Sequence, residues 1–340
     1  MGKEFNPTEY QKTLRQIFLQ EQRNLPTDLQ KSTDTVVPKE IITTEFPAMI
    51  QVGLSTVCNM RCPECYYREF QKSPNFHPTF MSPQIYRKII DEVGKFPETT
   101  LLRYLGRGES LTHPNIIEMV REAKGGIKGK VALITNGLLM TDKKACALLE
   151  TGIDVVDFSV DATTSETYAL VRGGRFDVLT SSIENFINLR NEGNYPTRIM
   201  ASFLIQPENY HEAEEFREVW KGKVDKVIFR RYHSYAGKIQ EKACVPEERH
   251  ACASLWNRVN INESGRITLC YIDWDETSVI ADLNDPEITI LGTWRNSYEE
   301  ARKGHISGEL PEICASCQTG WQAAHWQLSY ERAVNMVTEK

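Results

Sequence analysis

The chain has 340 residues, of which 41% are apolar and 25% are charged, a composition that supplies a large core and excludes disorder except at the ends. Its formal net charge of −6 argues against a nucleic-acid partner, because proteins that contact the phosphate backbone usually carry a basic stripe. No apolar run approaches the roughly 18 residues of a membrane span. The first residues contain no apolar signal core, so we expect a cytoplasmic protein without a membrane partner.

Residues 1–47 are predicted to form an N-terminal extension that packs on the main body and contains one amphipathic helix at about residues 10–22. From Met49 onward, short β-rich runs alternate with helical patterns, which is typical of βα units and a parallel sheet. The predicted strands are residues 49–56, 100–105, 130–135, 155–160, 198–205 and 226–231. Six such units predict an α/β fold, an open partial barrel over residues 48–237.

The sequence also predicts where two helices begin and how the chain is organised after the barrel. Ser82 with Pro83 is predicted to begin one helix, and Thr141 another that closes on Gly152. After residue 237 the alternation stops, and we take residues 238–249 as a linker. Residues 258–273 are predicted to form a hairpin that turns at Glu263–Gly265, within a small C-terminal domain at residues 250–340 that ends in a helix.

The nine cysteines favour metal binding over disulfides in a chain without a secretory signal. Cys58, Cys62 and Cys65 form C-x3-C-x2-C directly after the first predicted strand. Three thiolates on a short loop can hold three irons of a [4Fe–4S] cube and leave the fourth iron open for another ligand. A zinc ion would need a fourth protein ligand, and the nearest candidate, His77, lies twelve residues further on.

A second set comprises Cys252, Cys270, Cys314 and Cys317, in the pattern C-x12-G-x4-C followed by C-x2-C. By spacing alone these four thiolates suit a zinc ion as well as a second iron–sulfur cluster. Cys146 falls within a predicted helix and is expected to be a small core residue. Cys244 lies in a polar segment, either as an incidental thiol or as a hydrogen-atom donor.

The first cysteine set and the motifs after it resemble the radical S-adenosylmethionine (SAM) superfamily. Gly106–Ser110 (GRGES), Thr135–Gly137 (TNG) and Ser159–Asp161 (SVD) follow the second, third and fourth predicted strands in the order that the family shows. The resemblance covers about residues 48–237. It implies a partial (β/α)6 TIM-like barrel, a [4Fe–4S] cluster at the three cysteines, and SAM as cofactor.

The resemblance also implies SAM contacts. Gly108 and Glu109 would lie at the SAM amino group, Arg172 at its carboxylate, and Ser159 at the carboxylate or the ribose. Glu64 stands where the family usually has an aromatic residue, so Tyr66, or else Tyr67, is the candidate for contacting the adenine; Ser110 replaces the usual proline. For Arg172 the alternative is an exposed loop residue.

The second cysteine set resembles the twitch form, a half-length SPASM domain that follows some radical SAM barrels, over about residues 250–320. This resemblance implies a second [4Fe–4S] cluster at Cys252, Cys270, Cys314 and Cys317. Such a cluster near the substrate can accept an electron from a substrate radical or relay one to the first cluster.

Together the resemblances imply an oxygen-sensitive enzyme that reductively cleaves SAM, using a low-potential donor such as flavodoxin or ferredoxin, and forms a 5′-deoxyadenosyl radical that abstracts a hydrogen. The favoured substrate is a small molecule, with attack at a hydroxylated carbon of a sugar, aminosugar or cyclitol. Oxidation is favoured over epimerisation, in which Cys244 would return the hydrogen. The alternatives are a maturase of a ribosomally made peptide and, from another class, a non-catalytic iron–sulfur or zinc protein.

Substrate contacts are expected at the end of the sixth predicted strand, where a barrel places its active site. Arg230, Arg231, Tyr232, His233 and Tyr235 crowd this position. Alternate residues of a strand face opposite sides, so only some of them can face the substrate.

Overall fold

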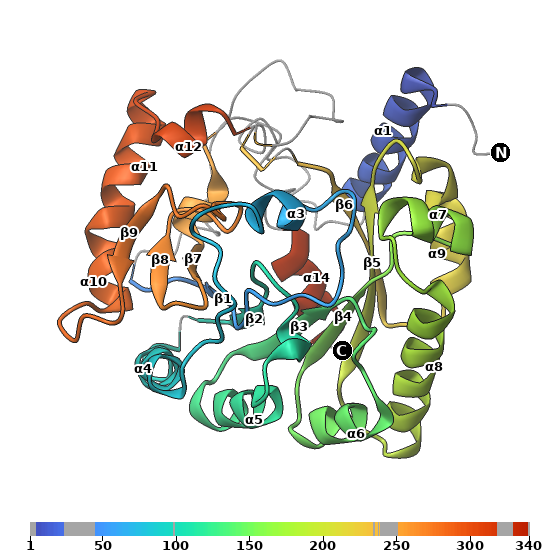
Figure 1. The fold of residues 1–340 in the computed structure, drawn as a ribbon, viewed down its shortest axis with the longest axis horizontal. Helices are drawn as coiled ribbons and strands as arrows, with labels where there is room; N and C mark the ends of the chain where they lie inside the picture. The colour runs from blue at the N-terminus through green and yellow to red at the C-terminus, as the bar shows by residue number, and fades with distance from the viewer. Residues whose placement is uncertain are drawn as a thin grey trace.

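The computed structural model describes residues 5–23, 45–97, 99–233, 235, 236, 238, 251–317 and 329–338 of the chain. Within these residues, nine strands form one sheet in the order β6-β5-β4-β3-β2-β1-β7-β8-β9. The first six are parallel and curve into an open barrel, with helices around the outside (Figure 1). This is the predicted α/β partial barrel.

All six predicted barrel strands are confirmed. They are β1 (Met49–Val52), β2 (Leu101–Tyr104), β3 (Lys130–Thr135), β4 (Val155–Ser159), β5 (Arg198–Ile205) and β6 (Lys226–Arg231). The first was predicted to continue to residue 56, but the strand ends at Val52. Beyond Val52 the chain leaves the sheet to form the cysteine loop, and Ser55 makes only an isolated bridge with Phe80.

Helices cover the outer face of the parallel strands (Figure 1). They are α4 (Pro83–Val93), α5 (Ile116–Gly126), α6 (Asp142–Glu150), α7 (Ser165–Val171), α8 (Phe176–Glu192) and α9 (Ala213–Trp220). The predicted caps hold: the Ser82 hydroxyl accepts from Ile85 N–H, and Thr141 accepts from Lys144 N–H. Gly152, with a φ of +75°, follows the end of α6.

The amphipathic helix predicted at about residues 10–22 is present as α1 (Pro7–Arg23). It packs on the barrel through the buried Tyr10 and Ile17, and the Tyr10 ring lies 5.5 Å from that of Tyr210. No helix in the described part of the chain is both long enough and apolar enough to span a bilayer.

The predicted hairpin forms, and it extends the barrel sheet. It consists of β7 (Arg258–Ile261) and β8 (Arg266–Thr268), with Gly265 at a φ of +85° in the turn, and β9 (Val279–Asp282) pairs with β8. β7 pairs in parallel with β1, so the sheet continues from the barrel into the C-terminal region. The helices α10 (Ile290–Arg295), α11 (Ser297–Ser307) and α12 (Glu312–Ala315) follow.

The interior of the barrel is closed at the amino ends of its strands by the last helix, α14 (Ser329–Thr338), which lies within the curve of the sheet (Figure 1). Its Tyr330, Val334 and Val337 side chains are buried against an apolar layer from the strands. That layer comprises Met49, Leu101, Ala132, Ile134, Val155, Met200 and Ile228. The active end of the barrel is therefore at the carboxyl ends, where the sequence motifs lie.

Candidate active site

The first cysteine set lies on the loop between β1 and the short helix α3 (Tyr67–Phe70). Cys65 N–H donates to Cys62 O over 3.1 Å, and Cys58 N–H donates to the Tyr67 hydroxyl over 3.0 Å. The thiols are close enough to act on one another electrostatically. Burial raises the pKa of each of the three thiols to about 12, so a metal would have to displace their protons on binding.

The second cysteine set is also brought together, from three segments of the C-terminal region. Cys270 follows β8, and its thiol acts electrostatically on those of Cys252, Cys314 and Cys317. Cys317 N–H donates to Cys314 O over 3.2 Å in a tight turn. Burial raises the pKa of Cys252 and of Cys270. Among the described residues, no three or more His, Cys, Asp or Glu side chains are grouped to hold one metal ion.

Glu109 joins three of the motifs. Its carboxylate accepts from Thr135 Oγ1 and Asn136 N–H, each over 2.8 Å, and its own N–H donates to Val57 O over 2.9 Å. Gly108 lies so close to the cysteine loop that a Cβ would meet Val57 O at 2.4 Å. The pKa of Glu109 is raised, because the effect of burial exceeds the opposing effect of the hydrogen bonds. The fold thus fixes the GRGES turn between the cysteine loop and the TNG motif.

Arg172, which caps the end of α7, is not an exposed loop residue. Its side chain is 15% exposed and pairs with two carboxylates of this chain. The guanidinium Nε lies 2.6 Å from Asp161 Oδ2 and 3.4 Å from Glu64 Oε1, and Nη1 lies 3.9 Å from Cys62 Sγ. Arg172 therefore ties the cysteine loop to the carboxyl end of β4.

The two tyrosines considered for the adenine contact have different surroundings. Tyr67 packs beneath the cysteine loop, with its hydroxyl on Cys58 N–H. The Tyr66 hydroxyl donates to Asp275 Oδ2 over 2.8 Å, and its ring lies 5.7 Å from the ring of Tyr235 and 6.0 Å from that of Trp274. Tyr66 therefore connects the cysteine loop to the C-terminal region.

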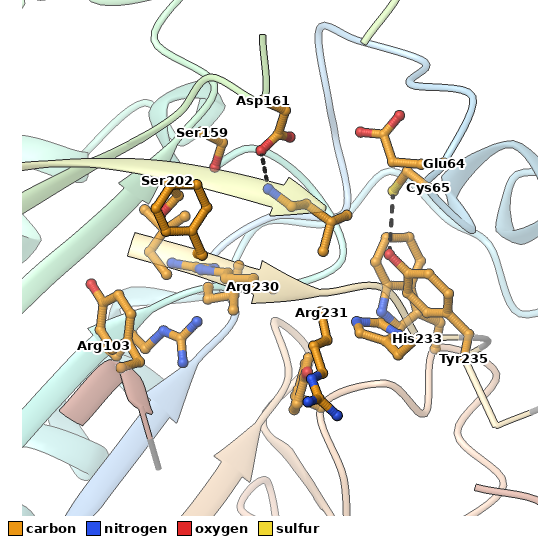
Figure 2. Close-up of a pocket in the computed structure, with 18 of the residues that line it drawn as sticks. Glu64, Cys65, Arg103, Ser159, Asp161, Ser202, Arg230, Arg231, His233 and Tyr235 are labelled. Atoms are coloured by element: carbon orange, nitrogen blue, oxygen red, sulfur yellow. Dashed lines mark hydrogen bonds between the residues drawn. The ribbon is translucent and has the colours of Figure 1, made fainter. Parts of the chain in front are cut away.

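A cavity of about 280 Å³ lies inside the barrel, between the cysteine loop and the arginines of β2 and β6 (Figure 2). Ser159 and Arg172 line it, as do Glu64 and Cys65, whereas Gly108, Glu109 and Tyr66 are not part of its wall. Five arginines line the wall: Arg103, Arg172, Arg230, Arg231 and Arg258. The cavity is thus bounded by the cysteine loop and by a strongly cationic wall.

His233 and Tyr235 are the other predicted contacts that line this cavity, together with Arg230 and Arg231. Burial, followed by the nearby Arg230, lowers the pKa of His233 to about 4, so the imidazole is neutral at physiological pH. Its Nδ1 is buried and makes no hydrogen bond within the described residues. Cys244, the predicted hydrogen-atom donor, lies outside the described residues.

Sequence reasoning missed Arg103, Arg258, Tyr271 and Tyr330, which also line the cavity. A signal was present for Arg103. It is a charged residue within the short buried strand LLRY, as is Asp157 within VVDFS. Buried charges in strands are uncommon unless they are paired or face a functional cavity.

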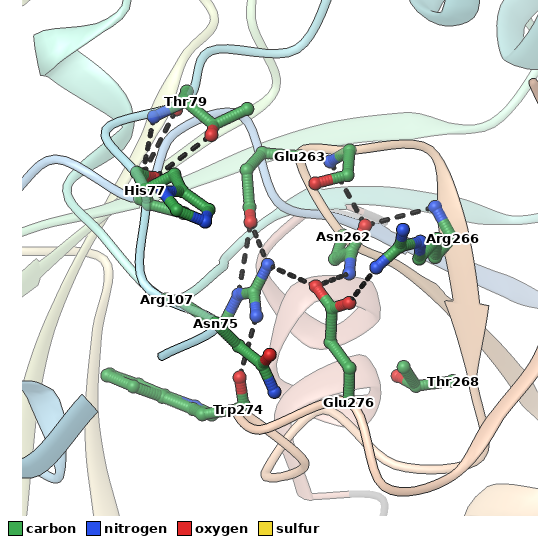
Figure 3. A network of polar contacts seen from close by, with 12 residues as sticks. Asn75, His77, Thr79, Arg107, Asn262, Glu263, Arg266, Thr268, Trp274 and Glu276 are labelled. Carbon is green, nitrogen blue, oxygen red and sulfur yellow. Dashed lines mark hydrogen bonds and ion pairs between the residues drawn. The ribbon is translucent and has the colours of Figure 1, made fainter. Parts of the chain in front are cut away.

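A second polar network connects the GRGES turn to the hairpin (Figure 3). The buried Arg107 guanidinium pairs with Glu263 in the hairpin turn and with Glu276, whose Oε1 lies 2.8 Å from Nη2. Arg107 Nη1 also donates to Trp274 O over 2.6 Å. The turn that carries Gly108 and Glu109 is thereby fixed to the C-terminal region.

Comparison with known proteins identifies the barrel. Residues 52–219 match the Radical SAM superfamily. The chain is 30% identical over 169 residues to the tungsten-containing aldehyde ferredoxin oxidoreductase cofactor-modifying protein of Pyrococcus furiosus, covering 49% of this chain and 46% of that protein. It is 30% identical over 147 residues to the AdoMet-dependent heme synthase of Methanosarcina barkeri, covering 42% and 40%. The matched region thus spans less than half the length of these relatives.

Solved structures share the fold over most of the chain. Streptococcus suis SuiB bound to its precursor peptide SuiA superposes with a TM-score of 0.64 at 14% identity, covering 92% of this chain and 83% of SuiB. BtrN in complex with AdoMet and 2-DOIA superposes with a TM-score of 0.55 at 16% identity, covering 81% of this chain and 94% of BtrN. At such identities these similarities establish the fold alone.

Proposed function

The chain belongs to the radical SAM superfamily through its domain at residues 52–219, and from this premise we propose that Cys58, Cys62 and Cys65 hold a [4Fe–4S] cluster at which SAM is reductively cleaved. The cluster and SAM, when bound, supply a 5′-deoxyadenosyl radical that abstracts a hydrogen atom from the substrate. The carrying observation is that the three thiols, the GRGES turn and the TNG motif meet at the carboxyl ends of the strands, joined through Glu109. The radical SAM domain argues against a non-catalytic protein.

The proposal extends to a second [4Fe–4S] cluster at Cys252, Cys270, Cys314 and Cys317, in a twitch domain. A four-cysteine zinc ion would hold sulfurs about 3.8 Å apart, given Zn–S bonds of about 2.3 Å in a tetrahedron. Each thiolate of a cube binds a different iron, so its sulfurs stand further apart. Cys270 interacts electrostatically with the other three thiols, and the set follows a radical SAM domain, which together favour a cluster over zinc.

We propose oxidation of a hydroxylated carbon of a sugar, aminosugar or cyclitol. The carbon's hydrogen atom would pass to the 5′-deoxyadenosyl radical, which becomes 5′-deoxyadenosine, and the hydroxyl proton would pass to a base. A cluster held by Cys252, Cys270, Cys314 and Cys317 would supply an acceptor for the remaining electron, so the carbinol would become a carbonyl. His233 lines the cavity wall as a neutral imidazole. The fold shared with BtrN, solved with 2-DOIA, favours a small molecule.

A peptide maturase is the second candidate, because the fold is shared over a larger part of this chain with SuiB, solved with its precursor peptide.

Electrons for SAM cleavage would come from a low-potential donor such as flavodoxin or ferredoxin.

The primary test is formation of 5′-deoxyadenosine from SAM by protein that has been anaerobically reconstituted with iron and sulfide and reduced. We expect product from the wild type and none from Cys62→Ala. A reconstituted wild type that contains iron but yields no 5′-deoxyadenosine with either dithionite or reduced flavodoxin would overturn the proposal.

We expect Arg172→Ala to weaken SAM binding by about 1.5 to 3 kcal/mol, roughly tenfold or more, because a charge-assisted pair with the SAM carboxylate would be lost. Equilibrium dialysis of SAM against reconstituted protein measures this. Arg175→Ala, at an exposed position three residues away, is the control. Unchanged SAM affinity would assign Arg172 to holding Asp161 and Glu64 only.

The fate of the substrate radical is tested by turnover in deuterated water. Oxidation yields a carbonyl product at the same rate in wild type and Cys244→Ala. Epimerisation instead places deuterium at the reacting carbon, because an exchangeable thiol returns the hydrogen, and Cys244→Ala then cleaves SAM without inverting the substrate. Deuterium incorporation that depends on Cys244 would contradict oxidation.

A further inference from the structure

We propose that the Tyr235 hydroxyl donates a hydrogen bond to the Cys65 thiolate and thereby raises the reduction potential of the first cluster, the [4Fe–4S] cluster proposed at the first cysteine set. The inference rests on that part of the proposed function and adds a residue that sets how readily the cluster is reduced. Tyr235 Oη lies 3.9 Å from Cys65 Sγ (Figure 2). Tyr235 lies outside residues 52–219, so the family match does not supply this contact.

Two side chains of the described residues donate to sulfurs of the first cysteine set. Arg172 Nη1 lies 3.9 Å from Cys62 Sγ, and the Tyr235 hydroxyl is the neutral counterpart at Cys65. Backbone N–H groups also donate to these sulfurs, and no substitution removes them without moving the chain. Removing the Tyr235 hydroxyl, by contrast, deletes one hydrogen bond and leaves every charge in place.

Three aromatic rings hold the Tyr235 ring against the cysteine loop. It stacks on Tyr66, with the ring centres 5.7 Å apart and the planes at 28°. Trp274 and His233 contact it edge to face, with ring centres at 5.5 Å and 4.4 Å. These contacts involve the ring and not the hydroxyl, so a phenylalanine at this position would keep them.

The backbone at Tyr235 is held in an unfavourable conformation. Tyr235 and Ala236 have φ angles of +50° and +57°, a region that residues with a Cβ seldom adopt. Ala236 is buried with Ile272 and Ile313, in the apolar cluster against which three thiols of the second cysteine set also pack. Contacts with the C-terminal region therefore hold the turn that directs Tyr235 at the first cysteine set.

The sign of the effect follows from the charges involved. A tyrosine hydroxyl keeps its proton at neutral pH, and a thiolate sulfur can only accept. The Tyr235 hydroxyl thus stabilises negative charge on Cys65, and a reduced cluster carries one more negative charge than an oxidised one. Hydrogen bonds to sulfur are among the factors that set the potential of an iron–sulfur cluster. Tyr235 therefore acts through Cys65, as a positioning residue, to make reduction by a low-potential donor easier.

The test compares the reduction potential of the first cluster in the wild type and in Tyr235→Phe. Both proteins are reconstituted anaerobically and titrated without SAM, while the electron paramagnetic resonance signal of the reduced cluster is recorded. The signal that changes when SAM is then added belongs to the first cluster, because only that cluster has an open iron for SAM.

We expect Tyr235→Phe to keep its iron content and to have the lower potential. At a fixed potential the ratio of reduced to oxidised first cluster should fall about threefold or more, equal to about 28 mV at about 59 mV per tenfold change for one electron. An unchanged or raised potential would overturn the inference, because a side chain that only packs would not alter the potential when its ring is retained.

Tyr168→Phe is the matched control. The Tyr168 side chain is close enough to Cys62 to interact with it electrostatically, and its buried hydroxyl makes no hydrogen bond within the described residues. This variant removes a hydroxyl beside the same loop without removing a donor to sulfur, so the potential should not change. A shift as large as that of Tyr235→Phe would show that any nearby hydroxyl has this effect and would refute the specific role of Tyr235.

These readouts separate the inference from the proposed function. If the wild type cleaves SAM but has the same potential as Tyr235→Phe, the role of Tyr235 is wrong and the proposed function stands. If Tyr235→Phe has the lower potential but the wild type forms no 5′-deoxyadenosine, the role of Tyr235 stands and reductive SAM cleavage is wrong. A reconstituted wild type without a cluster at the first cysteine set would overturn both.

Discussion

Replacing Cys58, Cys62 and Cys65 together by alanine is expected to lower the iron content after anaerobic reconstitution from about eight to about four per chain and to abolish SAM cleavage. The physical reason is that the three buried thiols on one loop are the proposed protein ligands of one cube. Iron and zinc analysis, together with the assay for 5′-deoxyadenosine, measures both effects.

Two further variants make this result specific. Cys252→Ala combined with Cys270→Ala should also leave about four irons, since the first cluster keeps its ligands. Cys146→Ala, on the partly buried side of α6, should change nothing. If the wild-type protein retained only about four irons together with one equivalent of zinc, the proposal of a second cluster would be wrong and that of the first would stand.

Arg107→Met is expected to reduce the free energy of unfolding by about 3 to 5 kcal/mol, because it removes one partner of a buried ion pair and leaves the Glu263 carboxylate uncompensated. Arg107 is 6% exposed, and Glu263 and Glu276 are 1% and 10% exposed. Burial raises the pKa of Glu263 whereas Arg107 lowers it, so loss of the arginine should raise that pKa further. Urea denaturation at neutral pH measures the change.

The matched control is Arg175→Met, which breaks an exposed pair with Asp177 and should leave the unfolding midpoint unchanged. The doubly substituted Arg107→Met, Glu263→Gln protein should recover part of the loss, because removing both charges leaves fewer unpaired groups. An Arg107→Met protein as stable as the wild type would show that the network contributes nothing to holding the GRGES turn against the hairpin.

The sequence alone determined the barrel and the position of its active end. Strands β3, β5 and β6 could be predicted to the residue, because buried parallel strands are apolar runs between capped helices. The motifs after the strands could be predicted to meet, because parallel strands bring their carboxyl ends to one edge. Spacing and chain order alone therefore place the cysteine loop, the GRGES turn and the TNG motif together.

The tertiary structure alone decided what surrounds that active end. The pairing of β7 with β1, the closure of the barrel by α14, and the link from Arg107 to Glu263 each join segments about 100 or more residues apart. Arg103 and Arg258 look like isolated charges in short strands until the sheet brings them to one cavity and Tyr330 covers the Arg103 guanidinium. Periodicity reports which face of an element is buried, but not which distant element buries it, so these contacts have no signature in the local sequence.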